Sequence, residues 1–274
     1  MNKNEFVEKL PKFVGSNEYK KKERKLIAEK KTSSTVKIMH SLKEVFDELN
    51  IKDGMCVSFH HHLRNGDYVQ NMVSEEILRR NLKNMHYAPS SIFPTNEILC
   101  KLIENGNVTT IDTNYLNGPV AKTIGEGKLE GLVYLNTHGG RPRKIESGEL
   151  KIDVAFIATP TVDKAGNGYG GKGNAACGSL GYAHSDLKYA NKVVLVTDNL
   201  VDKLDRVELE GKYVDIILVV DSIGDSNGIV SGTTKITRDP VGLKIASNTA
   251  KLIDELGLIK NGMSMQTGAG GTSL

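Results

Sequence analysis

The sequence predicts an α/β protein built on an open, mostly parallel β-sheet with helices on both of its faces. Three observations lead to this fold class. Apolar residues at helical spacing alternate along the chain with short, almost continuously apolar segments. These short segments lack the strict polar–apolar alternation of a sheet with one face in water, so both faces are expected to be covered. Histidine, arginine and glycine residues follow several of the short segments directly, where loops leave the carboxyl ends of parallel strands.

The predicted elements begin near residue 34 and continue along the whole chain. In order, we expect a helix at 38–49, a turn at 52–54, a strand at 55–59, a helix at 69–78, a helix from Thr95 or Asn96 to Ile103, strands at 108–113, 132–137, 154–159, 193–197 and 214–221, and a helix at 239–257. The last helix is the best marked, because Asp239 is a favourable cap, Pro240 suits the first turn and Gly257 suits the end.

The charge of the chain is unevenly distributed. Against 33 acidic residues there are 36 Lys and Arg residues, which gives a net charge of +3. Residues 18–31 contain seven basic and three acidic residues, so this segment carries +4 and the rest carries −1. Nucleic-acid binding proteins carry basic surface on the folded body, with aromatic residues interleaved. We therefore predict a solvated basic arm at residues 1–33, an α/β domain at residues 34–274 and no nucleic-acid partner.

Membrane insertion and secretion are not expected from this sequence. Its longest clean apolar stretch, Ile216–Val220, is far shorter than the roughly 18 residues of a membrane span. The first residues lack the apolar centre of a secretion signal. The odd number and wide spacing of Cys56, Cys100 and Cys177 argue against a disulfide scaffold or a cysteine zinc site. We expect a cytoplasmic protein without a membrane partner.

The end of the sequence looks incomplete. Residues 263–266 read as a strand and residues 267–274 as a glycine-rich turn, but the helix that such a turn should begin is missing. Because a buried strand needs a helix to cover it, we expect this chain to be the first half of a longer, two-domain polypeptide.

A long glycine-rich loop, residues 166–181, follows the strand predicted at 154–159. Its start matches the pattern G-x-G-x-x-G, and Asp186 lies near the expected position of a ribose-binding carboxylate, so a nicotinamide-dependent oxidoreductase is one alternative. That fingerprint requires a helix directly after the turn, whereas residues 172–181 are poor helix formers. We favour a cradle whose backbone amides contact a phosphate or a thioester carbonyl. Its glycines are Gly168, Gly170, Gly171 and Gly173.

Three consecutive histidines, His60, His61 and His62, follow another predicted strand. In an extended segment only His60 and His62 point the same way, and no H-E-x-x-H helix is present, so we expect no metal site. Arg64 and Asp67 come next along the chain. Because a guanidinium can bind a carboxylate through two parallel hydrogen bonds, we predict that this loop binds an anion.

The same chemistry recurs later in the chain. His138 and Arg141 flank a pair of glycines directly after a predicted strand, which suggests a second anion-binding loop. No covalent nucleophile is recognisable, because Cys177 has no neighbouring base in the sequence, and Ser58 and Ser179 lack the G-x-S-x-G elbow of a hydrolase.

Four segments of the chain resemble the alpha subunit of bacterial citrate lyase. They are Ser58–Asp67, Ser147–Phe156, Cys177–Ala183 and Met265–Gly271. The resemblance runs in the same order from about residue 34 to the end, and is more specific than any single glycine pattern. It implies a CoA-transferase-like fold. Because chains of that family are much longer, it also implies that this sequence is an amino-terminal half.

The activity implied by the resemblance is that of a citrate CoA-transferase, which exchanges acetate for citrate on the thiol of an acyl-carrier protein. The implied partners are citrate, an acetyl thioester, a beta subunit that cleaves the citryl thioester, and a gamma subunit. The gamma subunit carries a prosthetic group derived from dephospho-coenzyme A, so this chain itself is expected to bind no cofactor. A citrate carboxylate attacks the thioester in this chemistry, through a mixed anhydride, and no activated side chain is required.

With this activity in mind, the candidate residues receive specific roles. We expect Arg64 and Arg141 to bind citrate carboxylates, with hydrogen bonds from His60, His61 and His138. The backbone amides of two glycine segments, Gly168–Gly173 and Gly268, Gly270 and Gly271, are expected to face the thioester. A non-catalytic half that docks the carrier through the basic arm is a further alternative, because carrier proteins are acidic. Related transferases that use a covalent glutamate carry it in the other half.

Overall fold

The computed structural model describes residues 26–30, 32, 35–229, 236–265 and 271–272. The described residues fall into two compact units, one formed by residues 26–229 and the other by residues 236–265 and 271–272. The larger unit contains the sheet and the candidate site.

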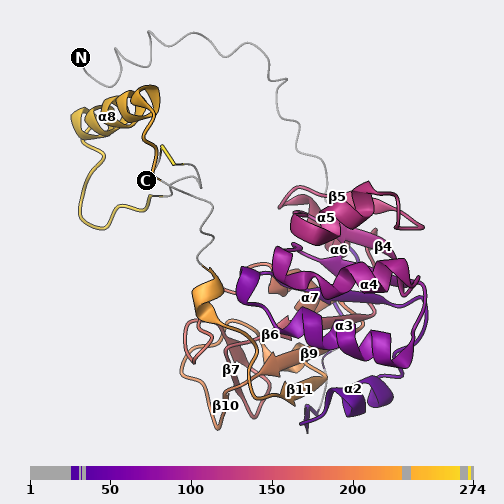
Figure 1. Ribbon diagram of the computed structural model, residues 1–274. Coiled ribbons are helices and arrows are strands. Elements are labelled where there is room, and N and C mark those ends of the chain that lie inside the picture. Colours follow the sequence, from indigo (N-terminus) through magenta and orange to yellow (C-terminus); the bar gives the residue numbers. More distant parts are fainter. Residues whose placement is uncertain (1–25, 31, 33–34, 230–235, 266–270, 273–274) are drawn as a thin grey trace. The chain divides into compact units, whose positions relative to one another are not determined.

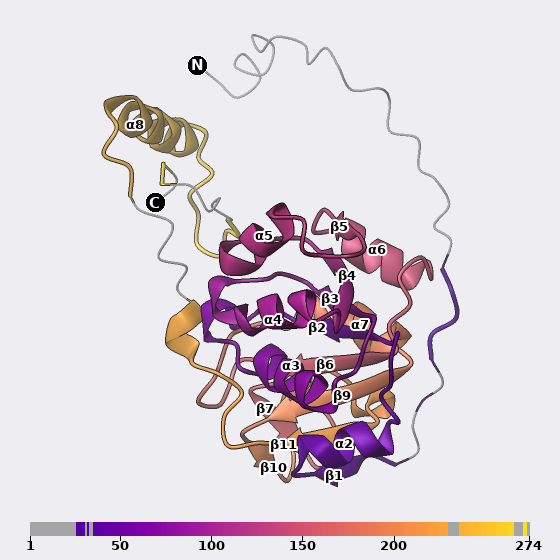
Figure 2. The same ribbon diagram turned by 45° about the vertical axis from the view of Figure 1, so that its right-hand side comes forward.

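An eight-stranded sheet forms the centre of the larger unit, and all of its neighbouring strands are parallel. From one edge to the other the strands are β1 (Lys37–Met39), β11 (Ile216–Val219), β9 (Lys192–Thr197), β6 (Val154–Ala158), β2 (Cys56–Phe59), β3 (Met85–Pro89), β4 (Val108–Thr113) and β5 (Val133–Leu135) (Figures 1 and 2). The predicted open, parallel sheet is confirmed.

The connections of this sheet reverse direction between β2 and β6. From β2 the chain proceeds through β3 and β4 to the edge at β5, then returns to β6 on the other side of β2 and continues through β9 to β11. Such a reversal leaves a crevice at the carboxyl ends of the two central strands, which is where ligands bind in open α/β sheets. Because β2 and β6 are parallel neighbours, the loop after Phe59 lies beside the loop after Ala158.

Helices cover both faces of the sheet, as predicted. The first face carries α2 (Leu42–Glu48), α3 (Val69–Arg80), α4 (Ile98–Glu104) and α5 (Gly118–Gly125), and the second carries α6 (Gly140–Glu146) and α7 (Ala183–Tyr189). Successive strand residues point to opposite faces. Accordingly, Phe156 of β6 belongs to the core that includes residues of α2 and α3, whereas Ile157 belongs to the core that includes Leu187 of α7. In both views α3 and α4 lie in front of the sheet (Figures 1 and 2).

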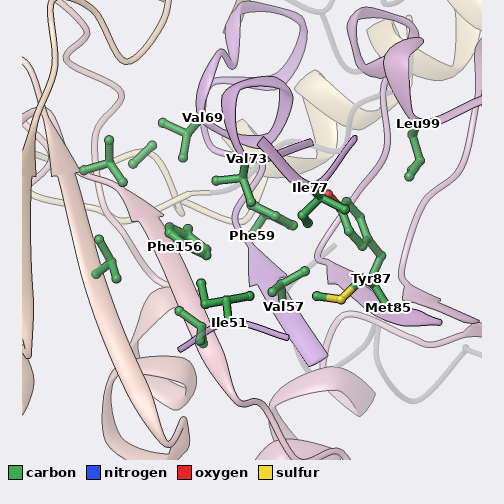
Figure 3. Close-up of a cluster of buried hydrophobic side chains, with 14 of the residues drawn as sticks. Ile51, Val57, Phe59, Val69, Val73, Ile77, Met85, Tyr87, Leu99 and Phe156 are labelled. Atoms are coloured by element: carbon green, nitrogen blue, oxygen red, sulfur yellow. The ribbon is translucent and has the colours of Figure 1, made fainter. Parts of the chain in front are cut away.

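Aromatic rings dominate the centre of the first core. Phe59 lies 6.1 Å from Phe156 and 5.3 Å from Tyr87, measured between ring centroids. Figure 3 shows these side chains with Val73 and Val57 between α3 and the strands. Because Phe59 is 2% exposed and ends β2, this packing fixes the strand from which the histidine loop departs.

A second, three-stranded sheet includes the beginning of the glycine-rich loop and was not predicted. Its order is β10 (Leu200–Val201), β7 (Thr161–Asp163) and β8 (Gly168–Tyr169), and β7 and β8 are antiparallel. The Asp163 carboxylate accepts hydrogen bonds from the backbone amides of Ala165 and Asn167, which closes the turn between β7 and β8. Residues 161–169 therefore form a β-hairpin.

Several predicted boundaries were wrong. Residues 37–39 are strand β1, and the helix predicted at 38–49 begins only after Ser41, whose hydroxyl caps α2. Strand β3 was not predicted, and the short helices α5, α6 and α7 gave too few turns to show periodicity. Residues 263–265 form no strand, and Gln266 lies outside the described residues. The remaining elements are the 3₁₀ turns η1 (Arg64–Gly66), η2 (Pro94–Asn96), η3 (Gly211–Tyr213) and η4 (Ser226–Ile229).

Residues 26–30 are bonded to the rest of the larger unit, contrary to the prediction that the solvated arm extends through residue 33. The amide of Ile27 donates to the carbonyl of Glu146, and the amide of Lys30 donates to that of Lys188. The Lys30 ammonium lies 2.6 Å from the Asp215 carboxylate, and its side chain is 12% exposed. Lys30 is therefore paired with Asp215 within the same unit. Most of the predicted arm, including residues 1–25, lies outside the described residues.

The smaller unit contains α8 (Pro240–Glu255). Asp239 accepts a hydrogen bond from the amide of Gly242, Pro240 occupies the first turn, and Gly257 has φ +61° just beyond the end. The caps predicted for this helix are confirmed, because each residue type suits the backbone conformation at its position.

Candidate functional site

A cavity of about 240 Å³ lies at the carboxyl end of β2, at the point where the connections of the sheet reverse. Three segments that are far apart in the sequence line it. They are the loop after β2 (His60, His61, His62 and Arg64), the segment before α7 (Cys177, Ser179, Leu180, Gly181 and Tyr182) and Ile229 of η4. The cavity thus combines the predicted histidine loop with the end of the predicted glycine loop.

Two of the three histidines bind neutral partners. His61 Nδ1 lies 2.6 Å from the hydroxyl of Ser90, and His62 Nε2 donates to the carbonyl oxygen of Ala158 at 2.6 Å. Burial, reinforced by the neighbouring His60, lowers the pKa of His61 to about 4 and that of His62 to about 3. Both imidazoles are therefore neutral at pH 7. They can donate and accept hydrogen bonds but carry no charge.

The third histidine, His60, has an acidic neighbour. Its Nε2 atom lies 3.5 Å from Oδ2 of Asp186, and both side chains are almost completely buried. The other carboxylate oxygen of Asp186, Oδ1, accepts a hydrogen bond of 3.0 Å from Nη2 of Arg141 and a second hydrogen bond from the hydroxyl of Ser58. Burial raises the pKa of the Asp186 carboxyl, but Arg141, His60 and Ser58 together lower it to a net value below its ordinary range. Asp186 is therefore ionised.

Arg141 is consequently not where the sequence analysis expected it. Its guanidinium is fully buried in the pair with Asp186 and does not line the cavity, although its Nε and Nη1 atoms have no hydrogen-bond partner among the described residues. A sequence cannot reveal this pair, because Asp186 and Arg141 come from different helices. The predicted two-arginine clamp is not assembled: only Arg64 reaches the cavity.

Arg64 is exposed at the cavity and has a strained backbone. Its φ of +51° lies in the left-handed region, which costs a non-glycine residue of order 1 kcal/mol or more. The conformation is held by two backbone bonds, from the Arg64 amide to the carbonyl of His61 and from the Asp67 amide to that of Arg64. The guanidinium forms no ion pair within the described part of the chain. It is thus a cation at the cavity that remains available to an anion.

Glycines bring η4 against the histidine loop. A Cβ atom on Gly66 would lie 1.9 Å from the carbonyl oxygen of Asp225, and one on Gly228 would lie 2.3 Å from the amide nitrogen of Gly66. The two backbones therefore touch, which no other residue type permits. This contact places Ile229 in the wall of the cavity.

The glycine cradle predicted at Gly168, Gly170, Gly171 and Gly173 is not part of the cavity lining. The amide of Gly168 donates to Leu209, and the amide of Gly170 donates to the Glu208 carboxylate, so neither is available. A Cβ atom on Gly170 would lie 2.0 Å from the carbonyl oxygen of Gly178, which shows that this loop needs glycine for its own folding. The cavity instead uses the later part of the loop, residues 179–182.

Other predicted residues lie away from the cavity lining. The Asp67 carboxylate accepts the amide of Gln70 at the start of α3 and is 6% exposed, so it caps a helix. His138 is exposed before α6, with its ring 5.7 Å from that of Tyr182. Gly268 and Gly270 lie outside the described residues, and Gly271 forms a turn in the smaller unit.

The sequence analysis missed Tyr182 as a residue of the site. Its ring lies 5.6 Å from that of His61 and joins the histidine loop to His138. The backbone amides of Ser179, Gly181 and Tyr182 make no hydrogen bond within the described residues, so they are accessible donors beside the cavity. The one available signal was that residues 179–182 directly precede α7, a helix that the sequence analysis did not predict.

Neither dinucleotide binding nor metal binding fits this geometry. The G-x-G-x-x-G pattern lies in the hairpin of β7 and β8 rather than between a strand and a helix, and Asp186 is buried against Arg141. Among the described residues, no three His, Cys, Asp or Glu side chains gather closely enough to hold a metal ion. Burial raises the pKa of the Cys177 thiol to about 12, so the cavity offers no thiolate nucleophile from this residue.

Comparison with known proteins identifies the family. Residues 35–274 match the family model of the citrate lyase alpha subunit (CitF). The citrate lyase alpha chain of Haemophilus influenzae is 42% identical over 245 residues, which make up 89% of this chain and 49% of that relative. The chain belongs to the citrate lyase alpha subunit family.

Other citrate lyase relatives match about the same share of this chain and of their own length. The alpha chain of Escherichia coli is 42% identical over 239 residues, covering 87% of this chain and 47% of its own length. The chain therefore spans about half the length of the curated citrate lyase relatives that it matches. The alpha subunit of citrate lyase of Streptococcus mutans, solved in complex with citrate, shares 43% identity with a TM-score of 0.79, over 96% of this chain and 51% of that chain.

More distant structures share the fold alone. An acyl-CoA transferase of Escherichia coli O157:H7 has a TM-score of 0.54 at 11% identity, over 81% of this chain and 56% of its own. The predicted CoA-transferase-like fold of this citrate lyase family member is thus confirmed. None of the helices in the described ranges combines the length and apolar character that a membrane span needs.

Proposed function

We propose that this chain is the citrate-binding part of a citrate CoA-transferase, which exchanges acetate for citrate on the thioester of an acyl-carrier protein. The observation that carries the proposal is Arg64. Its guanidinium lines a cavity at the reversal point of the sheet, without an ion pair among the described residues. The family relationship supports citrate as the anion, because a relative of 43% identity was solved with citrate bound.

Recognition of citrate would rely on one charge and several hydrogen bonds. Arg64 can hold a carboxylate through two parallel N–H···O bonds. The neutral imidazoles of His61 and His62 lie beside it and can bond the hydroxyl or a second carboxylate of the substrate. A neutral lining of this kind limits the desolvation cost of the site itself.

The transfer would need no nucleophile from the protein. A citrate carboxylate oxygen attacks the acetyl thioester carbon, and the carrier thiolate leaves, which gives a mixed anhydride. The thiolate then attacks the citryl carbonyl carbon, and acetate leaves. Holding the two reactants together can remove about 7–11 kcal/mol of the barrier. The free amides of Ser179, Gly181 and Tyr182 are suited to bind the developing oxyanion, where each well-placed donor contributes about 2.7–4 kcal/mol.

The thioester would come from a partner protein. The carrier proposed here is a gamma subunit with a prosthetic group derived from dephospho-coenzyme A, and the citryl product would pass to a beta subunit that cleaves it. No cofactor bound by this chain is needed for these steps. Because the chain spans about half the length of its relatives, we expect it to bind citrate but to transfer acyl groups slowly when alone.

Calorimetric titration of the chain with citrate tests the proposal. Arg64→Ala is expected to weaken citrate binding about 10- to 100-fold, because a hydrogen bond to a charged group contributes about 1.5–3 kcal/mol. Arg79→Ala is the matched control, since Arg79 is an exposed arginine of α3 paired with Glu76. Transfer from acetyl-carrier to citrate is measured in parallel, with the full-length Haemophilus influenzae relative as the reference. Equal citrate affinity in the wild type and Arg64→Ala would refute the assignment.

A further inference from the structure

Two neutral histidines of the cavity wall are each anchored through one ring nitrogen. Nδ1 of His61 lies 2.6 Å from the Ser90 hydroxyl, and Nε2 of His62 bonds a backbone carbonyl oxygen. The opposite nitrogens, Nε2 of His61 and Nδ1 of His62, make no hydrogen bond within the part of the chain that the structure describes, and both residues line the cavity. What these two nitrogens offer a ligand depends on which nitrogen of each ring carries the proton.

The partner of His62 determines its tautomer. A backbone carbonyl can only accept a hydrogen bond, so Nε2 carries the proton that is donated to Ala158 at 2.6 Å. Burial keeps the pKa of this ring near 3, and the neutral ring has a single N–H. Nδ1 of His62 is therefore a bare acceptor in the cavity wall.

The partner of His61 determines the opposite presentation. Ser90 is fully buried, and its hydroxyl oxygen already accepts the backbone amide of His61 at 3.1 Å. Among the described residues, the hydroxyl hydrogen finds its acceptor in Nδ1 of His61. If Nδ1 carried the proton instead, Ser90 would receive two donors and its own hydrogen would be buried without an acceptor, which is unfavourable. Ser90 therefore donates to Nδ1, and Nε2 of His61 carries the N–H.

We infer that Ser90 is a positioning residue that keeps His61 an N–H donor beside the bare acceptor of His62, so that the cavity selects a carboxylate that also carries a hydroxyl group. The inference rests on the proposed function, since citrate is such a hydroxy acid. Nε2–H of His61 would bind a carboxylate oxygen, and the substrate hydroxyl would donate to Nδ1 of His62. A polycarboxylate without the hydroxyl group would leave this nitrogen unpaired or facing a carboxylate oxygen, and two acceptors repel each other.

Tricarballylate, which is citrate without its hydroxyl group, tests this selection by calorimetry at a pH where both ligands are fully ionised. The wild type is expected to bind it about 10- to 100-fold more weakly than citrate, because Nδ1 of His62 loses its donor. His62→Gln keeps an N–H for Ala158 but presents no acceptor in the place of Nδ1, so the ratio of the two affinities should fall to near unity. Arg64→Ala should weaken both ligands alike. Equal affinity of the wild type for the two ligands, or an unchanged ratio in His62→Gln, would overturn the inference.

The role of Ser90 is measured by the tautomer of His61 in the chain without ligand. Long-range proton–nitrogen NMR correlations distinguish the two neutral tautomers, and His61 is expected in the Nε2–H form. In Ser90→Ala the His61 signals should shift towards a mixture of tautomers. Citrate should then bind about 3- to 10-fold more weakly, with its preference over tricarballylate retained, because His62 is unchanged.

Two further variants separate this role from a general effect on folding. Ser90→Thr keeps the hydroxyl and is expected to restore the Nε2–H form of His61. Ser74→Ala is the matched control, because Ser74 is another fully buried serine, whose hydroxyl bonds that of Tyr87. It should leave the tautomer and citrate affinity unchanged. An Nδ1–H form of His61 in the wild type, or the same tautomer in the wild type and Ser90→Ala, would contradict the role of Ser90.

Failure of the proposed function has a different signature, namely that the wild type binds neither citrate nor tricarballylate. In that event the NMR measurement decides the matter. An Nε2–H form of His61 that is lost in Ser90→Ala supports the positioning role of Ser90. A form that does not depend on Ser90 contradicts it.

Discussion

The backbone amide of Asp225 donates a 2.9 Å hydrogen bond to the carbonyl oxygen of Gly66. This bond joins the end of the histidine loop to the segment that carries Ile229 into the cavity wall. The contact exists because neither Gly66 nor Gly228 has a side chain at the point where the two backbones meet. The shape of the candidate site thus depends on a backbone contact between residues that the sequence keeps far apart.

Gly66→Ala should therefore disturb both stability and the cavity. The new methyl group would lie 1.9 Å from the Asp225 carbonyl oxygen, so one backbone must move, at a cost of about 1–3 kcal/mol. Chemical denaturation measures the loss, and citrate titration measures the damage to the site. Gly125→Ala in α5 is the control, because nothing lies within 4 Å of its added Cβ and alanine favours the helix. Equal stability of the two variants would show that η4 is not held by this contact.

Substitutions of Arg64 should affect the stability of the chain and its affinity for citrate separately. Arg64→Gly relieves the left-handed backbone and is expected to be about 1 kcal/mol more stable than Arg64→Ala, which keeps the strain. Both variants lack the guanidinium and should bind citrate equally weakly. Thermal or denaturant unfolding together with calorimetry separates the two effects. A glycine variant no more stable than the alanine variant would mean that the loop relaxes to another conformation.

Asp67 should make the protein less stable as the pH rises. Burial raises the pKa of its carboxyl from 3.8 to about 7. Between these values the folded chain binds a proton that the unfolded chain has lost, so this group's contribution to stability declines as pH increases towards 7 and then levels off. The difference of about three pKa units corresponds to at most roughly 4 kcal/mol. Asp67→Asn keeps a capping oxygen and should be more stable than the wild type at pH 8, with little difference at pH 4; denaturation curves at both values test this.

The basic segment should divide into two functional parts. Deleting residues 1–23 leaves the bonds of Ile27 and Lys30 in place, so the unfolding free energy should change little. Deletion through residue 31 leaves Asp215 without the buried Lys30 ammonium, and a loss of about 1–3 kcal/mol is expected. A carrier-binding role of the basic residues is therefore best tested with the shorter deletion. Equal stability of both truncated chains would contradict the packing of residues 26–30.

Local chemistry explains which parts of the fold and site were predictable. The caps of α8 and the apolar segment before the histidines are properties of neighbouring residues, so Asp239, Pro240 and Phe59 were assigned correctly. The same reasoning failed at Asp67, because a carboxylate that caps a helix and one that binds a ligand look alike in a sequence. It also failed at β1, where Ile38 continues a helical spacing but pairs with β11.

The sequence by itself determined the family, the parallel α/β architecture and the histidine loop with Arg64 as a candidate anion site. Only the tertiary structure decided which residues surround the cavity. It paired Arg141 with Asp186, left Gly168–Gly173 outside the cavity lining, and brought residues 179–182 and Ile229 into that lining. The physical reason is that burial, ion pairing and backbone contact at Gly66 arise between distant segments, and their energies depend on distances that no local pattern of residues contains.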